Sequence, residues 1–84
     1  MYMTNGICTE IERNEVFASE IASACSRFAR NDWGDTCASD KALNKQALLN
    51  GDRIVALYNT SKGRVFIITE SDRDVTTILF GHEY

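Results

Sequence analysis

The feature that most constrains this chain is a change in the spacing of its apolar residues after Gly51. Before Gly51, apolar side chains recur every three or four positions, the spacing of a helix with one buried face. After it come three short runs rich in β-branched and aromatic residues, RIVALYN, RVFIIT and VTTILF, separated by TSKG and ESDRD. Connections this short join antiparallel neighbours, because a parallel crossover needs about a dozen residues or more. The C-terminal part therefore predicts a three-stranded antiparallel meander.

Two helices are predicted before the meander. Asn14 is a suitable N-cap for a helix over residues 14–31. The apolar stripe of that helix has spacings of four, three and four, and consists of Phe17, Ile21, Ala24 and Phe28. A shorter helix is predicted in ASDKALNKQALLNG, with Ser39 as its N-cap and Asn50-Gly51 as its stop. Its apolar face would consist of Ala42, Leu43, Ala47 and Leu48. Residues 2–9 fit either a short edge strand or an ordered arm.

The order helix, helix, strand, strand, strand predicts one α+β domain spanning residues 1–84, with both helices on one face of the sheet. No proline and no internal repeat indicates a linker. Apolar residues occupy both sides of the first predicted strand, namely Ile54, Ala56 and Tyr58 on one side and Val55 and Leu57 on the other. The second sheet face is expected to pack on the N-terminal arm, on a second copy of the chain or on a partner. One helix on each face is the alternative.

Size and charge narrow the classes of function. A chain of 84 residues with 12 acidic and 9 basic side chains, and a formal charge of −3, is too small for separate cofactor and substrate lobes. Its acidity also makes direct nucleic-acid binding through phosphate contacts an unfavoured function. Cys8, Cys25 and Cys37 form no CxxC pair and indicate a reducing compartment. No apolar run approaches the ~20 residues of a membrane span. We expect a soluble protein in the cytoplasm.

The sequence predicts no catalytic centre, no metal site and no cofactor. His82 is the only histidine, and the five glycines are scattered singly, so neither a Cys-His pair nor a phosphate-binding loop is indicated. Asp32, Asp35 and Asp40 lie close together in the sequence, but aspartates in such a loop more commonly form turns and helix caps than metal sites. We therefore expect a protein that is not an enzyme.

Two polar segments are candidate contact sites for a protein partner. The first is DWGD at residues 32–35, which holds the only tryptophan, and the second is ESDRD at residues 70–74. Each can be a plain turn, with Trp33 folded back onto the first helix and with surface ion pairs worth up to ~1 kcal/mol. Alternatively, both lie on one rim, with Arg73 as an anchor, because arginine is enriched at interface hot spots. The candidate partner-binding residues are Asp32, Trp33, Asp35, Glu70, Asp72, Arg73, Asp74 and Tyr84.

The last two thirds of the chain resemble a known family. The matching segments are DWGD, then D-K-x-x-N-x-x-A-L-x-x-G-D-R-I, then I-I-T-E-S-D-R-x-V-T-T-I-L-F-x-x-E-Y, within residues 32–84. They are similar to a family of small bacterial proteins on plasmids, phages and gut mobile elements. Members are often named plasmid-related protein or type I restriction endonuclease subunit M. This chain departs from the family at residues 81–84, with G-H-E-Y in place of P-E-E-Y.

The resemblance implies a mobile-element setting near defence genes, because 84 residues cannot hold the cofactor lobe of a methyltransferase subunit. The expected function is that of a phage- or plasmid-borne inhibitor of a bacterial defence nuclease complex, anti-CRISPR first and anti-restriction next. It would block a nucleic-acid-binding or nuclease surface, with its acidic residues facing basic ones. An alternative is a nucleic-acid-associated regulator or accessory factor of the element, using Arg13, Arg27 and Arg30 or Lys41 and Lys45. A homodimer through the open sheet face is a third possibility.

Overall fold

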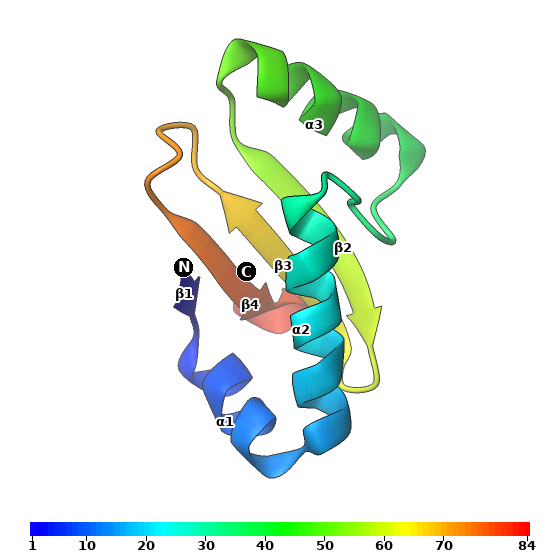
Figure 1. The fold of residues 1–84 in the computed structure, drawn as a ribbon, viewed down its shortest axis with the longest axis vertical. Helices are drawn as coiled ribbons and strands as arrows, with labels where there is room; N and C mark the ends of the chain where they lie inside the picture. The colour runs from blue at the N-terminus through cyan, green and yellow to red at the C-terminus, as the bar shows by residue number, and fades with distance from the viewer.

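A computed structural model describes residues 1–84 as a four-stranded sheet with three α-helices and a short C-terminal 3-10 helix (Figure 1). The strand order across the sheet is β1-β4-β3-β2. In chain order the elements are β1 (Tyr2–Met3), α1 (Asn5–Arg13), α2 (Glu15–Ala29), α3 (Ala38–Asn50), β2 (Ile54–Thr60), β3 (Gly63–Thr69), β4 (Thr76–Phe80) and η1 (Gly81–Glu83). The α+β class is confirmed, with one more α-helix than the sequence predicted and with a short strand in residues 2–9, where the sequence fitted either an edge strand or an ordered arm.

The predicted meander is present, but it is part of a mixed sheet. β2 pairs antiparallel with β3, and β3 pairs antiparallel with β4. β1 then adds parallel to β4, pairing Tyr2 with Thr77 and Met3 with Ile78. A parallel pair is possible here because nearly the whole chain separates the two strands and serves as the crossover. The prediction of an antiparallel sheet was therefore incomplete at this edge.

A helix that the sequence analysis missed follows β1. The side chain of Thr4 caps α1 by accepting a hydrogen bond from the backbone N–H of Ile7 at 3.3 Å, and Ile7 is fully buried. Asn14 alone separates α1 from α2. Its side chain accepts a hydrogen bond from the N–H of Phe17 at 3.0 Å, so the predicted N-cap of the long helix is confirmed.

The predicted second helix is present as α3, but its N-cap differs. Cys37 occupies the cap position without a side-chain hydrogen bond, and Ser39 lies within the first turn. The prediction of Ser39 as the cap was wrong by two residues. At the other end, Gly51 has a φ of 75°, in the left-handed region that favours glycine at the end of a helix.

The predicted apolar face of α3 is largely exposed. Of its four residues, only Ala47 is buried, while Leu43 is 61% exposed and Leu48 is 43% exposed. Asn44 is buried instead, at 4% exposure. A polar side chain thus faces the rest of the protein at a position where an amphipathic helix would place an apolar one.

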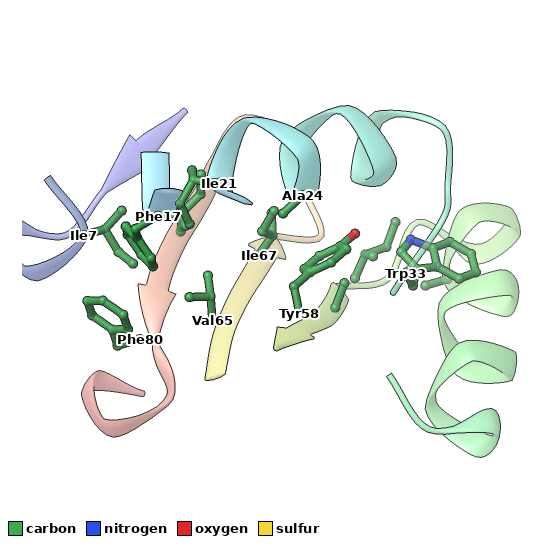
Figure 2. Packing of buried hydrophobic residues seen from close by; sticks show 13 residues of the cluster. Ile7, Phe17, Ile21, Ala24, Trp33, Tyr58, Val65, Ile67 and Phe80 are labelled. Atoms are coloured by element: carbon green, nitrogen blue, oxygen red, sulfur yellow. The ribbon is translucent and has the colours of Figure 1, made fainter. Parts of the chain in front are cut away.

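The core lies between the sheet and the first two helices (Figure 2). Ile7 of α1 and Phe17 of α2 contribute to the same buried cluster as the inward residues of the strands, such as Tyr58, Val65 and Ile67. α3 lies instead across the beginning of β2, beyond the end of α2 (Figure 1). The expectation that both predicted helices cover one face holds for α2 and not for α3.

The opposite face of the sheet, here called the outer face, is also apolar. Ile68 and Leu79 are buried on it, whereas Val55 and Phe66 are only half-buried. The ring of Tyr84 stands edge-on to that of Phe66, with 5.1 Å between ring centroids. The N-terminal segment does not cover this face, because α1 joins the core on the other side. The outer face is therefore covered only in part, by Tyr84, and Leu43 of α3 lies at its margin, where it lines a hollow with Val55 and Phe66.

Candidate functional site

The corner loop, residues 32–36, is tied to the end of α2 by an ion pair. The guanidinium of Arg27 donates two hydrogen bonds to the carboxylate of Asp32, at 2.9 and 3.3 Å, and the N–H of Gly34 donates a third at 3.1 Å. The bonds from Arg27 and then Gly34 hold the pKa of Asp32 below its ordinary value. The same contact raises the pKa of Arg27. Asp32 is thus engaged within the protein.

Gly34 allows the corner loop to pass against an aromatic ring. Its φ is 59°, and a Cβ at this position would lie 2.5 Å from a ring carbon of Tyr58. The hydroxyl of Tyr58 donates a hydrogen bond to the carbonyl of Asp32 at 2.7 Å. Burial also raises the pKa of Tyr58, so the phenol stays a donor. Both the backbone conformation and the close approach therefore require glycine.

The rest of the corner loop forms hydrogen bonds with the backbone along the free edge of β2, and we call this covering of the edge the seal. The N–H of Asp35 donates to the carbonyl of Leu57 at 2.9 Å, and the N–H of Leu57 donates to the hydroxyl of Thr36 at 2.9 Å. The carboxylate of Asp35 accepts a hydrogen bond from the N–H of Asn59 at 2.8 Å. An unpaired edge strand offers its backbone groups to other chains, and this loop occupies them. Asp35, like Asp32, has an internal structural role.

Asn44 completes the seal from α3. Its side-chain amide donates to the carbonyl of Val55 at 2.8 Å and accepts from the N–H of the same residue at 3.1 Å. This pair of bonds reproduces what a neighbouring strand would offer at that position. The sequence analysis missed this role, and the only signal for it was a polar residue on the expected apolar face of the helix.

Trp33 is a core residue of the corner loop. It is 8% exposed, and Figure 2 shows its indole beside α3. It belongs to the same buried cluster as Ala24 of α2, and its expected contact with the first predicted helix stays a prediction. Its buried Nε1 has no hydrogen-bond partner. This large buried ring gives α3 an apolar surface to pack against.

The second candidate segment, residues 70–74, attaches to the other end of α3. Arg73 has a φ of 66°, and its guanidinium donates to the carbonyls of Ala47 at 2.9 Å and Asp52 at 2.8 Å. The carbonyl of Ala47, in the last turn of α3, also accepts the N–H groups of Gly51 and Asp52, and a cation at this end is favoured by the helix dipole. Glu70 forms a surface ion pair of 3.4 Å with Arg53. Arg73 thus holds α3 in place.

The two candidate segments lie at opposite ends of α3 (Figure 1). The corner loop leads into its first turn, whereas Arg73 binds carbonyls at its last turn. A helix of 13 residues is about 20 Å long. The candidate residues therefore form two separate groups and not one rim.

The group at the C-terminal end of α3 includes a surface that is free for contacts with a partner. Leu48 and Leu49, in the last turn of α3, are 43% and 86% exposed. The contacts of Arg73 with the carbonyls of Ala47 and Asp52 bring the turn with the exposed Asp72 and Asp74 to the same end of the helix. We call this surface the α3-end surface, and it consists of Leu48, Leu49, Asp52, Asp72 and Asp74. Asp72 accepts a hydrogen bond from the N–H of Asp74 at 3.0 Å, which orders the turn and leaves the carboxylates at the surface.

The possible metal ligands, basic residues and cysteines considered in the sequence analysis do not gather into a site. Nowhere in the structure do three or more His, Cys, Asp or Glu side chains gather closely enough to hold a metal ion. Arg27 of the possible basic face is bound to Asp32, while Lys41 and Lys45 are exposed on α3. Burial raises the pKa of Cys25, which disfavours its thiolate. None of the helices combines the length and apolar character needed to span a bilayer.

The C-terminal residues Glu83 and Tyr84, which follow the two positions where the chain departs from the resembled family, have a structural role. The carboxylate of Glu83 accepts hydrogen bonds from the hydroxyl of Thr4 at 2.7 Å and from the N–H of Phe80 at 2.8 Å. This joins the two ends of the chain and places Tyr84 on the outer face.

Comparison of the chain with protein-family models, curated proteins and solved structures gives no match.

Proposed function

We propose that this protein is a non-enzymatic inhibitor that binds a bacterial defence nuclease complex in the host cytoplasm and blocks its nucleic-acid-binding or nuclease surface. A CRISPR effector is the first target class and a restriction complex the second. The mobile-element setting comes from the family resemblance of residues 32–84. The observation that carries the proposal is the α3-end surface, where exposed leucines and exposed carboxylates lie at the same end of one helix.

The chemistry of this surface suits a partner that is both apolar and basic. Leu49 is 86% exposed on α3, a helix held to the rest of the protein by hydrogen bonds from the side chains of Asn44 and Arg73 to backbone carbonyls, so its side chain is available to a partner. Burying such a side chain contributes about 1.5–3 kcal/mol. Asp72 and Asp74 would face the lysine and arginine residues that otherwise hold phosphates, which raises the association rate and favours such partners.

The geometry also reduces the number of candidate anchors. Asp32 and Asp35 are satisfied by internal hydrogen bonds, and Trp33 is buried, so these three would act through the fold. Arg73 would act by holding α3 and the acidic turn together. The proposed direct contacts are therefore those of the α3-end surface.

The experiment is a binding measurement between the purified protein and purified CRISPR effector and restriction complexes at several salt concentrations. The double substitution Asp72→Asn with Asp74→Asn should slow association about tenfold at low salt, and the difference should shrink as salt rises. Leu49→Ala should mainly speed dissociation.

The matched control is Glu12→Gln with Glu15→Gln, which removes the same two charges from exposed positions on α1 and α2. Binding of this variant should remain close to that of the unmodified protein. Absence of binding to every complex at low salt and micromolar concentration would overturn the proposal. Equal losses in the two double variants would show that net charge, and not the α3-end surface, determines binding.

A further inference from the structure

The outer face carries an aromatic ridge between two hollows. Phe66 and Tyr84, whose rings meet edge-on, line both hollows, which have volumes of about 610 and 360 Å³. Tyr84 is 59% exposed. In the larger hollow the ring of His82 lies nearly parallel to that of Phe80, with 5.2 Å between centroids. Tyr84 therefore presents its ring to both hollows, and the exposed His82, stacked on the core residue Phe80, adds a second ring to the larger one.

The charge lining these hollows is opposite in sign to that of the whole chain. Lys62 and Arg64 line the larger hollow and Arg53 lines the smaller one, whereas Asp40 is the only acidic side chain in either lining. The chain as a whole has 12 acidic and 9 basic residues. A local excess of cations on an acidic protein favours an anionic ligand at that place.

These cations can exchange their present partners for a ligand. Arg53 and Lys62 make ion pairs of 3.4 and 3.8 Å with surface glutamates, and such exposed pairs contribute little free energy. Arg64 is exposed and makes no ion pair. The guanidinium of Arg53 lies 5.7 Å from the ring centroid of Tyr84, so cation and ring can act on one ligand.

We propose that the outer face binds single-stranded nucleic acid. One base would stack in each hollow, on either side of Tyr84, while Arg53, Lys62 and Arg64 contact the phosphates between them. Stacking platforms combined with backbone-tracking cations are the chemistry by which proteins hold single strands without reading sequence. A duplex keeps its bases stacked within itself, so it cannot fill the hollows. An acidic peptide satisfies the cations but offers no flat ring at regular spacing.

This inference goes beyond the proposed inhibitor function and does not depend on it, since the α3-end surface shares no residue with the two hollows. Its test is fluorescence anisotropy with labelled single-stranded DNA and RNA of about 12 nucleotides, covering one site of this size. The unmodified protein should bind both at low salt. The plot of log affinity against log salt should have a slope of about −2, as expected for three phosphate contacts with a single strand.

Two matched pairs of variants locate the site. Tyr84→Ala should weaken binding about tenfold, whereas Tyr84→Phe, which keeps the ring, should bind like the unmodified protein. Arg64→Ala should weaken binding, whereas Lys45→Ala, which removes the same charge from an exposed position on α3, should not. Far-ultraviolet circular dichroism of each variant verifies that it is folded.

Several results would overturn the assignment. No binding at low salt would do so, and so would equal affinities for Tyr84→Ala and Tyr84→Phe. Equal losses for Arg64→Ala and Lys45→Ala would point to net charge alone. Competition by duplex DNA or by a glutamate-rich peptide, with the same potency as by an unlabelled single strand, would show that the surface binds anions in general.

Discussion

Trp33 illustrates how a residue that looks like a contact site can be part of the core. Its ring is 8% exposed between β2 and α3, and its Nε1 lacks a partner. We predict that Trp33→Ala lowers the free energy of unfolding by ~3 kcal/mol or more, because the cavity beneath α3 cannot collapse fully. Urea denaturation followed by circular dichroism measures this change.

Trp33→Phe is the matched control for that prediction. It keeps an aromatic ring and removes an N–H that has no acceptor, so its cost should be smaller than that of Trp33→Ala. If Trp33→Ala leaves the free energy of unfolding unchanged and abolishes partner binding, then the corner loop is a contact site and not a structural element.

Asp32 should make stability depend on acid pH. Its hydrogen bonds with Arg27 and Gly34 lower its pKa in the folded protein from the ordinary value of 3.8. The unfolded chain therefore takes up this proton first as the pH falls below that value. The resulting contribution to stability is present above the unfolded pKa and is lost as the pH falls through the folded pKa.

The measurement is the free energy of unfolding of the protein and of Asp32→Asn across this acid range. Asp32→Asn should be less stable at neutral pH and should show a shallower decline with acid. Parallel declines in the two proteins would mean that other carboxylates account for the acid sensitivity.

At the scale of elements, the sequence predicted what local periodicity determines. The apolar stripe of α2, the C-terminal end of α3 at Gly51 and the three meander strands follow from residues close together in the chain. α1 was missed because nine residues with one fully buried side chain carry little periodic signal. The seal on β2 was also missed, because Asp35 contacts a residue 24 positions away. Such contacts have no local pattern.

The seal itself gives a prediction for one element. Asn44→Ala should cost about 2–3 kcal/mol, because it removes both hydrogen bonds to Val55 and leaves edge groups of β2 without partners. Asn44→Asp keeps the acceptor for the N–H of Val55 but places a carboxylate oxygen against its carbonyl, so it should also destabilise. Hydrogen exchange at Val55 reports the loss directly. Unchanged protection of that amide in Asn44→Ala would contradict the role of the seal.

At the scale of the whole molecule, polar contacts and burial separate two kinds of surface. The corner loop and Asn44 use their polar groups inside the fold, whereas the α3-end surface and the outer face leave theirs available. The sequence placed acidic and aromatic candidates in both kinds without distinguishing them. Only the folded chain shows that Asp35 is used by a strand edge and that Arg64 on the outer face is not paired.

The two edges of the sheet are protected unequally, and this leads to a prediction about self-association. The β2 edge is closed by the corner loop and Asn44, whereas the β4 edge pairs with the two residues of β1 and accepts one further hydrogen bond, from the N–H of Thr4 to the carbonyl of Ile78 at 3.1 Å. Deleting residues 1–3 should expose backbone groups of β4 and promote strand pairing between copies. Sedimentation velocity over a tenfold range of concentration should show a larger average mass for the truncated chain than for the full chain.

Tyr2→Ala with Met3→Ala is the matched control, because it removes the exposed apolar side chains of β1 but keeps the backbone that pairs with Thr77 and Ile78. This variant should sediment like the full chain. If this variant associates as strongly as the truncated chain, then the side chains of β1, and not its backbone pairing with β4, prevent association. If the full chain is already a dimer that Tyr84→Ala dissociates, the outer face is a contact between copies, and the homodimer becomes the better account of that surface.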